Sequence, residues 1–180
     1  LNGDVDANTG TVTIDAGGLI THDAAIGSDN NTASVTIASA EGSLDSNNTI
    51  DSVGLISITT GANVDLANAV TAGTSIAVDA GGTVDAAAIL DAGTSAAVSS
   101  DDTVSLVDTI ARSGNASITG LDVTLAGPVN AINNDIIVTA DNNIASSAAL
   151  GGLNNTNNVT LRANTGWINS SAGITAVTNA

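Results

Sequence analysis

The chain has 180 residues, of which 43% are hydrophobic, yet it contains no Phe, Tyr, Met or Cys and a single Trp. Such a composition excludes an ordinary thick globular core, and the lack of Cys excludes a disulfide framework and thiol chemistry. The net charge of −16, with two arginines as the only Lys or Arg residues, argues against nucleic acid and against anionic membranes, because both are bound by cationic patches.

A unit of about 20 residues recurs from one end of the chain to the other. Its clearest copy, residues 73–92, reads GTSIAVDAGGTVDAAAILDA and contains three short apolar sites. When the unit is moved along the chain, every site is filled by Ile, Leu or Val: Ile14, Ile37, Ile58, Val78, Val98, Ile118, Val138 and Leu161 at the first site; Ile20, Leu44, Val64, Val84, Val104, Val123, Ile144 and Ile168 at the second; and Ile26, Ile50, Val70, Leu90, Ile110, Val129, Leu150 and Ile174 at the third. This periodicity is typical of a solenoid, in which each repeat buries its apolar face against its neighbours.

The segments around these sites are predicted to be strands. Residues 76–78 and 64–66 alternate in type with period two, and β-branched residues are frequent. No run of ten residues has a sustained helical stripe, and Gly and Asn recur too often for stable helices. The sequence therefore predicts an all-β fold, a parallel β-helix (β-solenoid) with about nine coils of roughly twenty residues, three short strands per coil and a spacing of roughly 4.8 Å between coils. Residues 1–180 are expected to form a single domain, because no linker interrupts the repeat.

At the N-terminus, residues 1–7 are expected to complete a partial coil, and residues 10–26 to form the first full one. The sequence contains neither a signal-peptide pattern nor an apolar run long enough for a membrane span. Because the chain begins within a coil, we expect it to be a segment of a longer protein or a processed product. His22, the only histidine, is expected to be a tolerated polar residue at the margin of the solenoid rather than a catalytic or metal-binding group.

Two insertions interrupt the repeat after the third site, GSDNNTA at residues 27–33 and GGLNNTNN at residues 151–158. They are expected to project from the same corner of the rod, and each contains Asn-Asn-Thr. Insertions in repeat proteins form loops that often bind ligands, so a host or cell-surface glycan is a candidate partner. The alternative, that corners simply tolerate extra polar residues, stays open. The candidate binding residues are Asp29, Asn30, Asn31 and Thr32 in the first insertion and Asn154, Asn155 and Thr156 in the second.

In the middle of the chain, Asp45, Asp65 and Asp85 each follow the second site and are expected to stack in one outward-facing column. Their backbones would lie roughly 4.8 Å apart. Like charges on neighbouring strands are destabilising, and the chain has no Lys to compensate them. A Ca²⁺ ion, which prefers carboxylate oxygens, is therefore a candidate cofactor, whereas no other cofactor is predicted. Alternatively, the carboxylates spread into water and are screened by salt.

Toward the C-terminus, the single proline lies at a predicted corner, and Arg162 and Trp167 occur together in the last coil. Trp167 is expected to cover the open end of the apolar core rather than to provide a platform for sugars. Catalysis is not predicted, because the carboxylates have no Lys partner, and no phosphate-binding loop, Ser-His-Asp set or zinc cluster is present. A polysaccharide-active β-helix enzyme is a minor alternative.

The segments GTVTIDAGGLI, GTSIAVDAGGTVDAAAILDAG and NVTLRANTGWINSSAGITA resemble the repeats of filamentous haemagglutinin-type exoproteins of bacterial two-partner secretion. The resemblance covers nearly the whole chain. It implies a long right-handed parallel β-helix, exported to the bacterial surface as an adhesin or structural fibre. It implies no catalytic residue, because the repeat region of that family has none to match. The family's secretion domain, with its Asn-Pro-Asn-Gly type signature, is not in this chain.

Both ends of the chain pass through coils without a polar capping segment, so strand edges and apolar columns are expected to be open there. Such ends favour stacking of copies end to end, or continuation into a longer passenger. The sequence thus predicts an extracellular structural or adhesive rod on a bacterial cell surface. The alternative is a module that binds a glycan or receptor through its Asn-rich corner loops.

Overall fold

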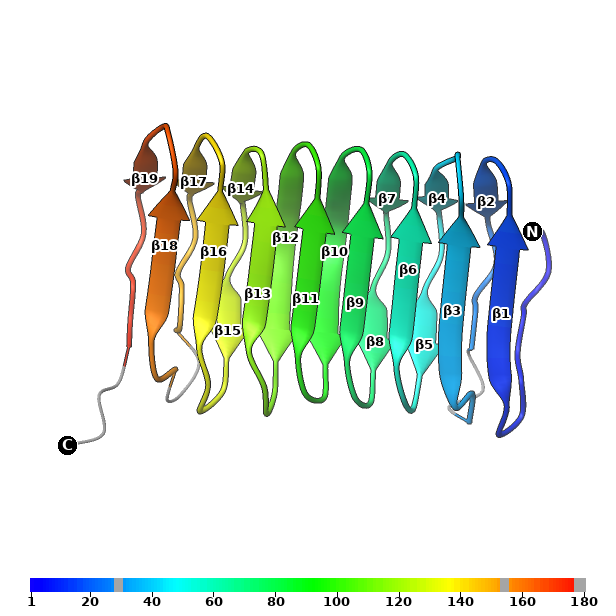
Figure 1. The fold of residues 1–180 in the computed structure, drawn as a ribbon. Coiled ribbons are helices and arrows are strands. Elements are labelled where there is room, and N and C mark those ends of the chain that lie inside the picture. Colours follow the sequence, from blue (N-terminus) through cyan, green and yellow to red (C-terminus); the bar gives the residue numbers. More distant parts are fainter. Residues whose placement is uncertain (28–30, 153–155, 177–180) are drawn as a thin grey trace.

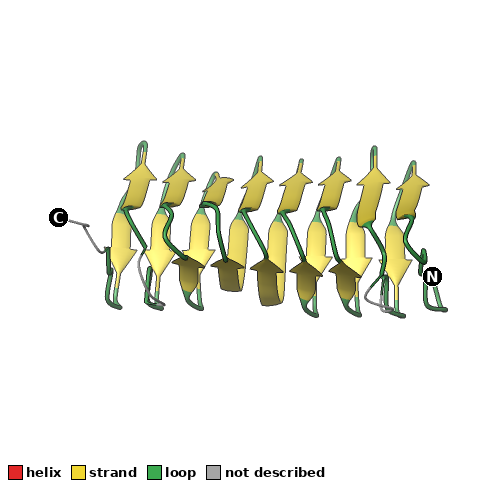
Figure 2. Ribbon diagram, turned by 90° about the horizontal axis from the view of Figure 1, so that it is seen from below, coloured by secondary structure: helices red, strands yellow, loops and turns green. Residues whose placement is uncertain are grey.

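The computed structural model describes residues 1–27, 31–152 and 156–176, which form nineteen strands and no helix. Every pairing between these strands is parallel. The described ranges contain no apolar helix long enough to span a membrane. The predicted all-β solenoid is confirmed, and its coils stack in a single row from the N-terminal to the C-terminal end (Figures 1 and 2).

The strands lie on three sides of the solenoid. The first sheet contains β1 (Thr11–Ala16), β3 (Ser34–Ser39), β6 (Ile56–Thr60), β9 (Ile76–Ala80), β11 (Ala96–Ser100), β13 (Ala116–Gly120), β16 (Ile136–Ala140) and β18 (Val159–Ala163). The second side contains β2 (Ile20–His22), β4 (Leu44–Ser46), β7 (Val64–Leu66), β14 (Val123–Leu125), β17 (Ile144–Ser146) and β19 (Ile168–Ser170), together with the first halves of β10 (Val84–Ala92) and β12 (Val104–Ala111). The third side contains β5 (Ile50–Ser52), β8 (Val70–Ala72) and β15 (Val129–Ala131), together with the second halves of β10 and β12.

The solenoid is right-handed. In Figure 1 the chain runs upward through the near strands of the first sheet and returns downward on the far side, while it advances from right to left. The eight strands of the first sheet define eight coils. This is one fewer than the prediction of about nine, because residues 1–7 add no strand and pair through the bridge between Val5 and Ile26.

The predicted columns at the first and second sites are confirmed throughout. Ile14 pairs with Ile37, and the same register continues coil by coil to Leu161. At the second site the column runs from Ile20 to Ile168. The twenty-residue period therefore places equivalent residues next to each other on successive coils.

The third column contains one error of prediction. Thr109, not Ile110, lies between Leu90 and Val129. Only Val107 and Asp108 separate Leu106 from Thr109, whereas three residues separate the equivalent positions of the preceding coil. The corner is thus one residue shorter, which turns Thr109 inward and Ile110 outward.

The core is a narrow stack of aliphatic side chains. Residues at the three sites are almost completely buried in the middle coils, and small inward residues complete each layer. Burying each Ile or Leu side chain stabilises the fold by about 2 kcal/mol before the entropy of ordering is subtracted. Two residues after the third site, the next inward-facing position is filled by a small residue: Ser52, Ala72, Ala92, Ala111 and Ala131.

Candidate functional site

The three aspartates of the predicted column lie directly beside one another. Asp45 pairs with Asp65, and Asp65 with Asp85, on β4, β7 and β10. On the neighbouring coils the same position is occupied by Thr21, which pairs with Asp45, and by Ser105, which pairs with Asp85. Partial burial raises the pKa of Asp65, and the carboxylates of Asp85 and Asp45 raise it further. The column is therefore a line of mutually repelling charges.

The structure gives this column no support as a calcium site, and the calcium prediction stays a prediction. Across the described residues, no group of three or more His, Cys, Asp or Glu side chains is placed so that it could hold a metal ion. Ca²⁺ requires six to eight oxygens that converge on one point. Side chains on successive parallel strands instead point outward in parallel, so their oxygens form a row.

The sequence alone did not reveal one ion pair in the middle of the rod. Arg112 donates from Nε to Oδ1 of Asp91 at 2.8 Å and from Nη2 to Oδ2 at 2.6 Å. These hydrogen bonds raise the pKa of Arg112. The shortened corner before Thr109 sets Ala111, not Arg112, opposite the inward Ala92. The exposed side chain of Arg112 then reaches back to Asp91, which itself pairs with Ile110. Knowledge of that one-residue shift would have been needed to find it.

Asp108 and Thr109, at the same corner, have buried oxygens without a hydrogen-bond partner among the described residues, namely Oδ1 of Asp108 and Oγ1 of Thr109. Burial raises the pKa of Asp108, and the nearby charge of Asp91 raises it further. Two carboxyls in different environments are the pattern that acid-base catalysis uses. Here, however, the Asp91 carboxylate is already engaged by Arg112, so the corner does not present an open pair.

The two insertions leave the solenoid in the same way. Each begins with a glycine in the left-handed region, Gly27 with φ of 76° and Gly151 with φ of 77°. A Cβ atom added to Gly27 would lie 1.9 Å from the backbone oxygen of Asp51, and one added to Gly151 would lie 2.0 Å from the backbone oxygen of Thr175. Because Gly27 and Gly151 follow Ile26 and Leu150 of the third column, both insertions start at the same corner, as predicted.

Two of the candidate binding residues face inward. Thr32 is 1% exposed and Thr156 is 0% exposed. Oγ1 of Thr32 accepts a hydrogen bond from Ala7 N at 3.3 Å, and Oγ1 of Thr156 donates to Ala131 O at 3.0 Å. They cannot contact a ligand as predicted, because the chain re-enters the solenoid at these residues and turns their side chains into the core. The alanines at the equivalent inward positions of other coils could have indicated this.

The other candidates in the insertions are less well placed by the structure. Asn31 is exposed, and its backbone oxygen accepts a hydrogen bond from Thr9 N at 3.1 Å. Asp29, Asn30, Asn154 and Asn155 lie outside the described residues. The structure therefore fixes the position from which both loops leave the rod, and the glycan prediction stays a prediction.

His22 is in the interior, not at the margin. Its side chain is completely buried in the column that continues with Ser46 and Leu66. The prediction failed because His22 follows Ile20 by two residues and therefore points to the same face as that core residue. Burial lowers the pKa of His22.

Trp167 does not cover the end of the core. It is 53% exposed and lies at the corner before β19, while Ile168 and Ile174 are 47% and 49% exposed. The backbone of Trp167 continues the stack, since its oxygen accepts from Ile144 N and its N–H donates to Oδ1 of Asn143. The corner position directs the indole away from the apolar columns.

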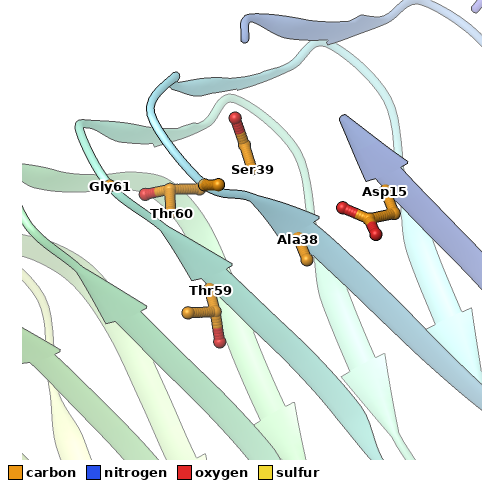
Figure 3. A pocket seen from close by; sticks show the side chains of 7 residues that line it. Asp15, Ala38, Ser39, Thr59, Thr60 and Gly61 are labelled. Carbon is orange, nitrogen blue, oxygen red and sulfur yellow. The ribbon is translucent and has the colours of Figure 1, made fainter. Parts of the chain in front are cut away.

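Two shallow hollows lie near the N-terminal coils. One of 240 Å³ lies where β1, β3 and β6 end, and is lined by Asp15, Ala38, Ser39, Ala40, Thr59, Thr60 and Gly61 (Figure 3). The other, of 300 Å³, is lined by Leu1, Ile14, Asp15, Ala16, Leu19, Ile20 and Thr21. Asp15 is the single carboxylate in each lining, so neither hollow holds the two carboxyls that glycoside hydrolysis uses.

Comparison of the chain with known protein families, curated proteins and solved structures finds no match.

Proposed function

We propose that this chain forms part of an extracellular structural or adhesive rod on a bacterial cell surface. The observation that supports this most is the uninterrupted stack of eight parallel coils, whose first sheet has β1 and β18 as its outermost strands. An outermost strand can pair through its backbone with a further strand. The resemblance to filamentous haemagglutinin-type repeats supports the same function, and the high negative charge favours solubility outside the cell.

The partner in this proposal is more β-helix, either further coils of a longer chain or a second copy. The side chains at the two ends suit a second copy. One outward column of the first sheet begins with Asp15 and ends with Arg162. When a second rod stacks in the same register, Arg162 of one copy comes beside Asp15 of the next, where opposite charges attract.

A second column, at the corner between the first and second sides, supports the same contact. Its end members, Leu19 and Trp167, are 67% and 53% exposed. The members between them are polar: Ser43, Asn63, Thr83, Thr103, Asp122 and Asn143. Stacking would bring the two large apolar side chains together. Because Val5 and Ile174 occupy the same third side, one of these two end segments moves aside at the joint.

Sedimentation velocity over a range of concentrations tests this association. Arg162→Asp is expected to weaken self-association about tenfold by placing two acids at the joint, and the double variant Arg162→Asp with Asp15→Arg is expected to restore it. Asp79→Arg, in the same column but in the middle of the rod, is the matched control and should leave association unchanged. Equal association of the wild type and Arg162→Asp would rule out this joint.

A binding module is the second candidate function, supported by the two insertions that begin with the same glycine conformation at one corner. Because Thr32 and Thr156 are core residues, deletions should remove residues 28–30 and 153–155 and keep both threonines. Lost adhesion to cells or glycan arrays, with an unchanged melting temperature, would support binding by the loops. Unchanged adhesion would eliminate it.

A further inference from the structure

The ring of His22 is enclosed by the N-terminal coil. The side chain is 0% exposed, and Nδ1 lies 2.9 Å from Ala24 O. Because a carbonyl oxygen can only accept a hydrogen bond, Nδ1 must be the donor, and in the neutral ring Nε2 then has a lone pair and no proton. Nε2 is buried and has no hydrogen-bond partner among the described residues. The neutral ring is thus the form that fits.

Protonation of Nε2 would place a charge and an unpaired N–H donor in the core. Both are costly without a partner. Three charged groups act on the ring: the Leu1 ammonium opposes protonation, while Asp23, which follows β2, and Asp45, on β4, favour it. Asp23 already accepts a hydrogen bond from Nδ2 of Asn47 at 3.0 Å. Burial is the largest effect and lowers the pKa of His22.

The coil that contains His22 runs from β1 through β2 to Ile26 and is held by backbone contacts on both of its sides. Its connection to the segment before it includes the hydrogen bond from Asp23 N to Leu1 O, and its connection to the next coil includes that from Asn47 N to His22 O. Coils in a solenoid contact only their neighbours, so one coil can open locally while the others stay folded.

We propose that His22 is an acid-sensitive latch: protonation of its ring opens the coil formed by residues 11–26 while the remaining coils stay folded. In the open coil the pKa of His22 returns to its ordinary value of 6.5, whereas it is lower in the closed coil. Stability of the closed coil is therefore constant above pH 6.5 and falls as the pH drops below that value, until the closed-state pKa is reached. Opening increases by up to about tenfold per pH unit in this window.

Hydrogen exchange followed by mass spectrometry tests the latch on the intact chain, made without a polyhistidine tag. Between pH 7 and pH 5, and after correction for the intrinsic exchange rate, protection of residues 11–26 is expected to fall by up to about tenfold per pH unit below 6.5. Protection of residues 84–111 should stay constant. His22→Leu is the matched variant, since Leu66 occupies the same column, and it should remove the pH dependence of residues 11–26.

Three outcomes would overturn the proposal. The first is an equal acid-dependent loss of protection in His22→Leu, because the loss would then be caused by protonation of carboxylates and not of His22. The second is unchanged protection of residues 11–26 in the wild type, and the third is a loss that is uniform along the rod. A titration by nuclear magnetic resonance is independent of the variant's folding, because the single histidine gives one ring signal. A midpoint at or above 6.5 in the closed coil would also contradict the latch.

Discussion

At the scale of single residues, the buried hydroxyl of Thr109 is expected to lower the free energy of unfolding by a measurable amount. Oγ1 has no partner among the described residues, although Thr109 is completely buried between Leu90 and Val129. Thr109→Val keeps the shape and removes the unpaired group, so it is expected to raise the free energy of unfolding by about 1 kcal/mol. Denaturant unfolding measures the change.

Thr60 provides the control for this substitution. It is also buried, but its Oγ1 donates to Ala62 O at 2.9 Å. Thr60→Val should therefore lower the free energy of unfolding by about 1 kcal/mol, because it leaves an acceptor unpaired. Destabilisation by both variants would mean that Thr109 has a partner in solution.

The aspartate column gives a second prediction at this scale. Asp65→Asn removes the central charge and is expected to stabilise the rod by about 0.5 kcal/mol at pH 7, a small effect because solvent screens the carboxylates. The pKa of Asp65 is raised above 3.8, so the repulsion is relieved as the pH falls through the raised pKa and is absent below 3.8. The melting temperatures of the variant and the wild type should differ most at pH 7 and should be equal at pH 3.5. An equal difference at both pH values would contradict this prediction.

Calcium distinguishes screening from binding in the same column. If the ion only screens the carboxylates, as their arrangement in a row suggests, Ca²⁺ should shift the melting temperature of wild type and Asp65→Asn by similar small amounts. If Ca²⁺ instead raises the melting temperature of the wild type by a large amount and does not raise that of Asp65→Asn, specific binding by Asp45, Asp65 and Asp85 is demonstrated.

At the scale of single elements, the shortened corner before Thr109 limits the corner of the next coil. There a Cβ added to Gly127 would lie 1.1 Å from Val107 O. Gly127→Ala must therefore displace the backbone, and it is expected to reduce the free energy of unfolding by about 3 kcal/mol. Gly17→Ala, where an added Cβ meets nothing within 4 Å, is the control and should cost little. Similar denaturation midpoints for both variants would show that the corner is not tightly packed.

The same corner shows how far the elements could be predicted from the sequence. Strands and their register followed from aliphatic residues that recur every twenty positions. That rule selected Ile110 because it is aliphatic, but it could not detect a missing residue upstream. The inward alanines Ala92 and Ala111, which pair in the structure, could have revealed the shift, since they are 19 residues apart. Thr32 and His22 were misplaced because polarity was used to infer exposure, whereas the repeat position decides it.

At the scale of the whole molecule, the fold was predictable because each coil contacts only its neighbours, so one period determines the architecture. The coil number was overestimated, since residues 1–7 contribute no strand of the first sheet. The candidate site was less predictable. Which side chains converge depends on corner geometry and on insertions, and these vary from one coil to the next.

Electron microscopy of the purified chain at low concentration tests the proposed rod most directly. Eight coils at roughly 4.8 Å give a rod roughly 40 Å long. We expect unbranched fibres of one-rod width that are many times longer than this, with an axial repeat near 4.8 Å, and that shorten in Arg162→Asp. Single particles no longer than one chain at every concentration would contradict association through the ends, and fibres without that repeat would contradict continuous stacking of the coils.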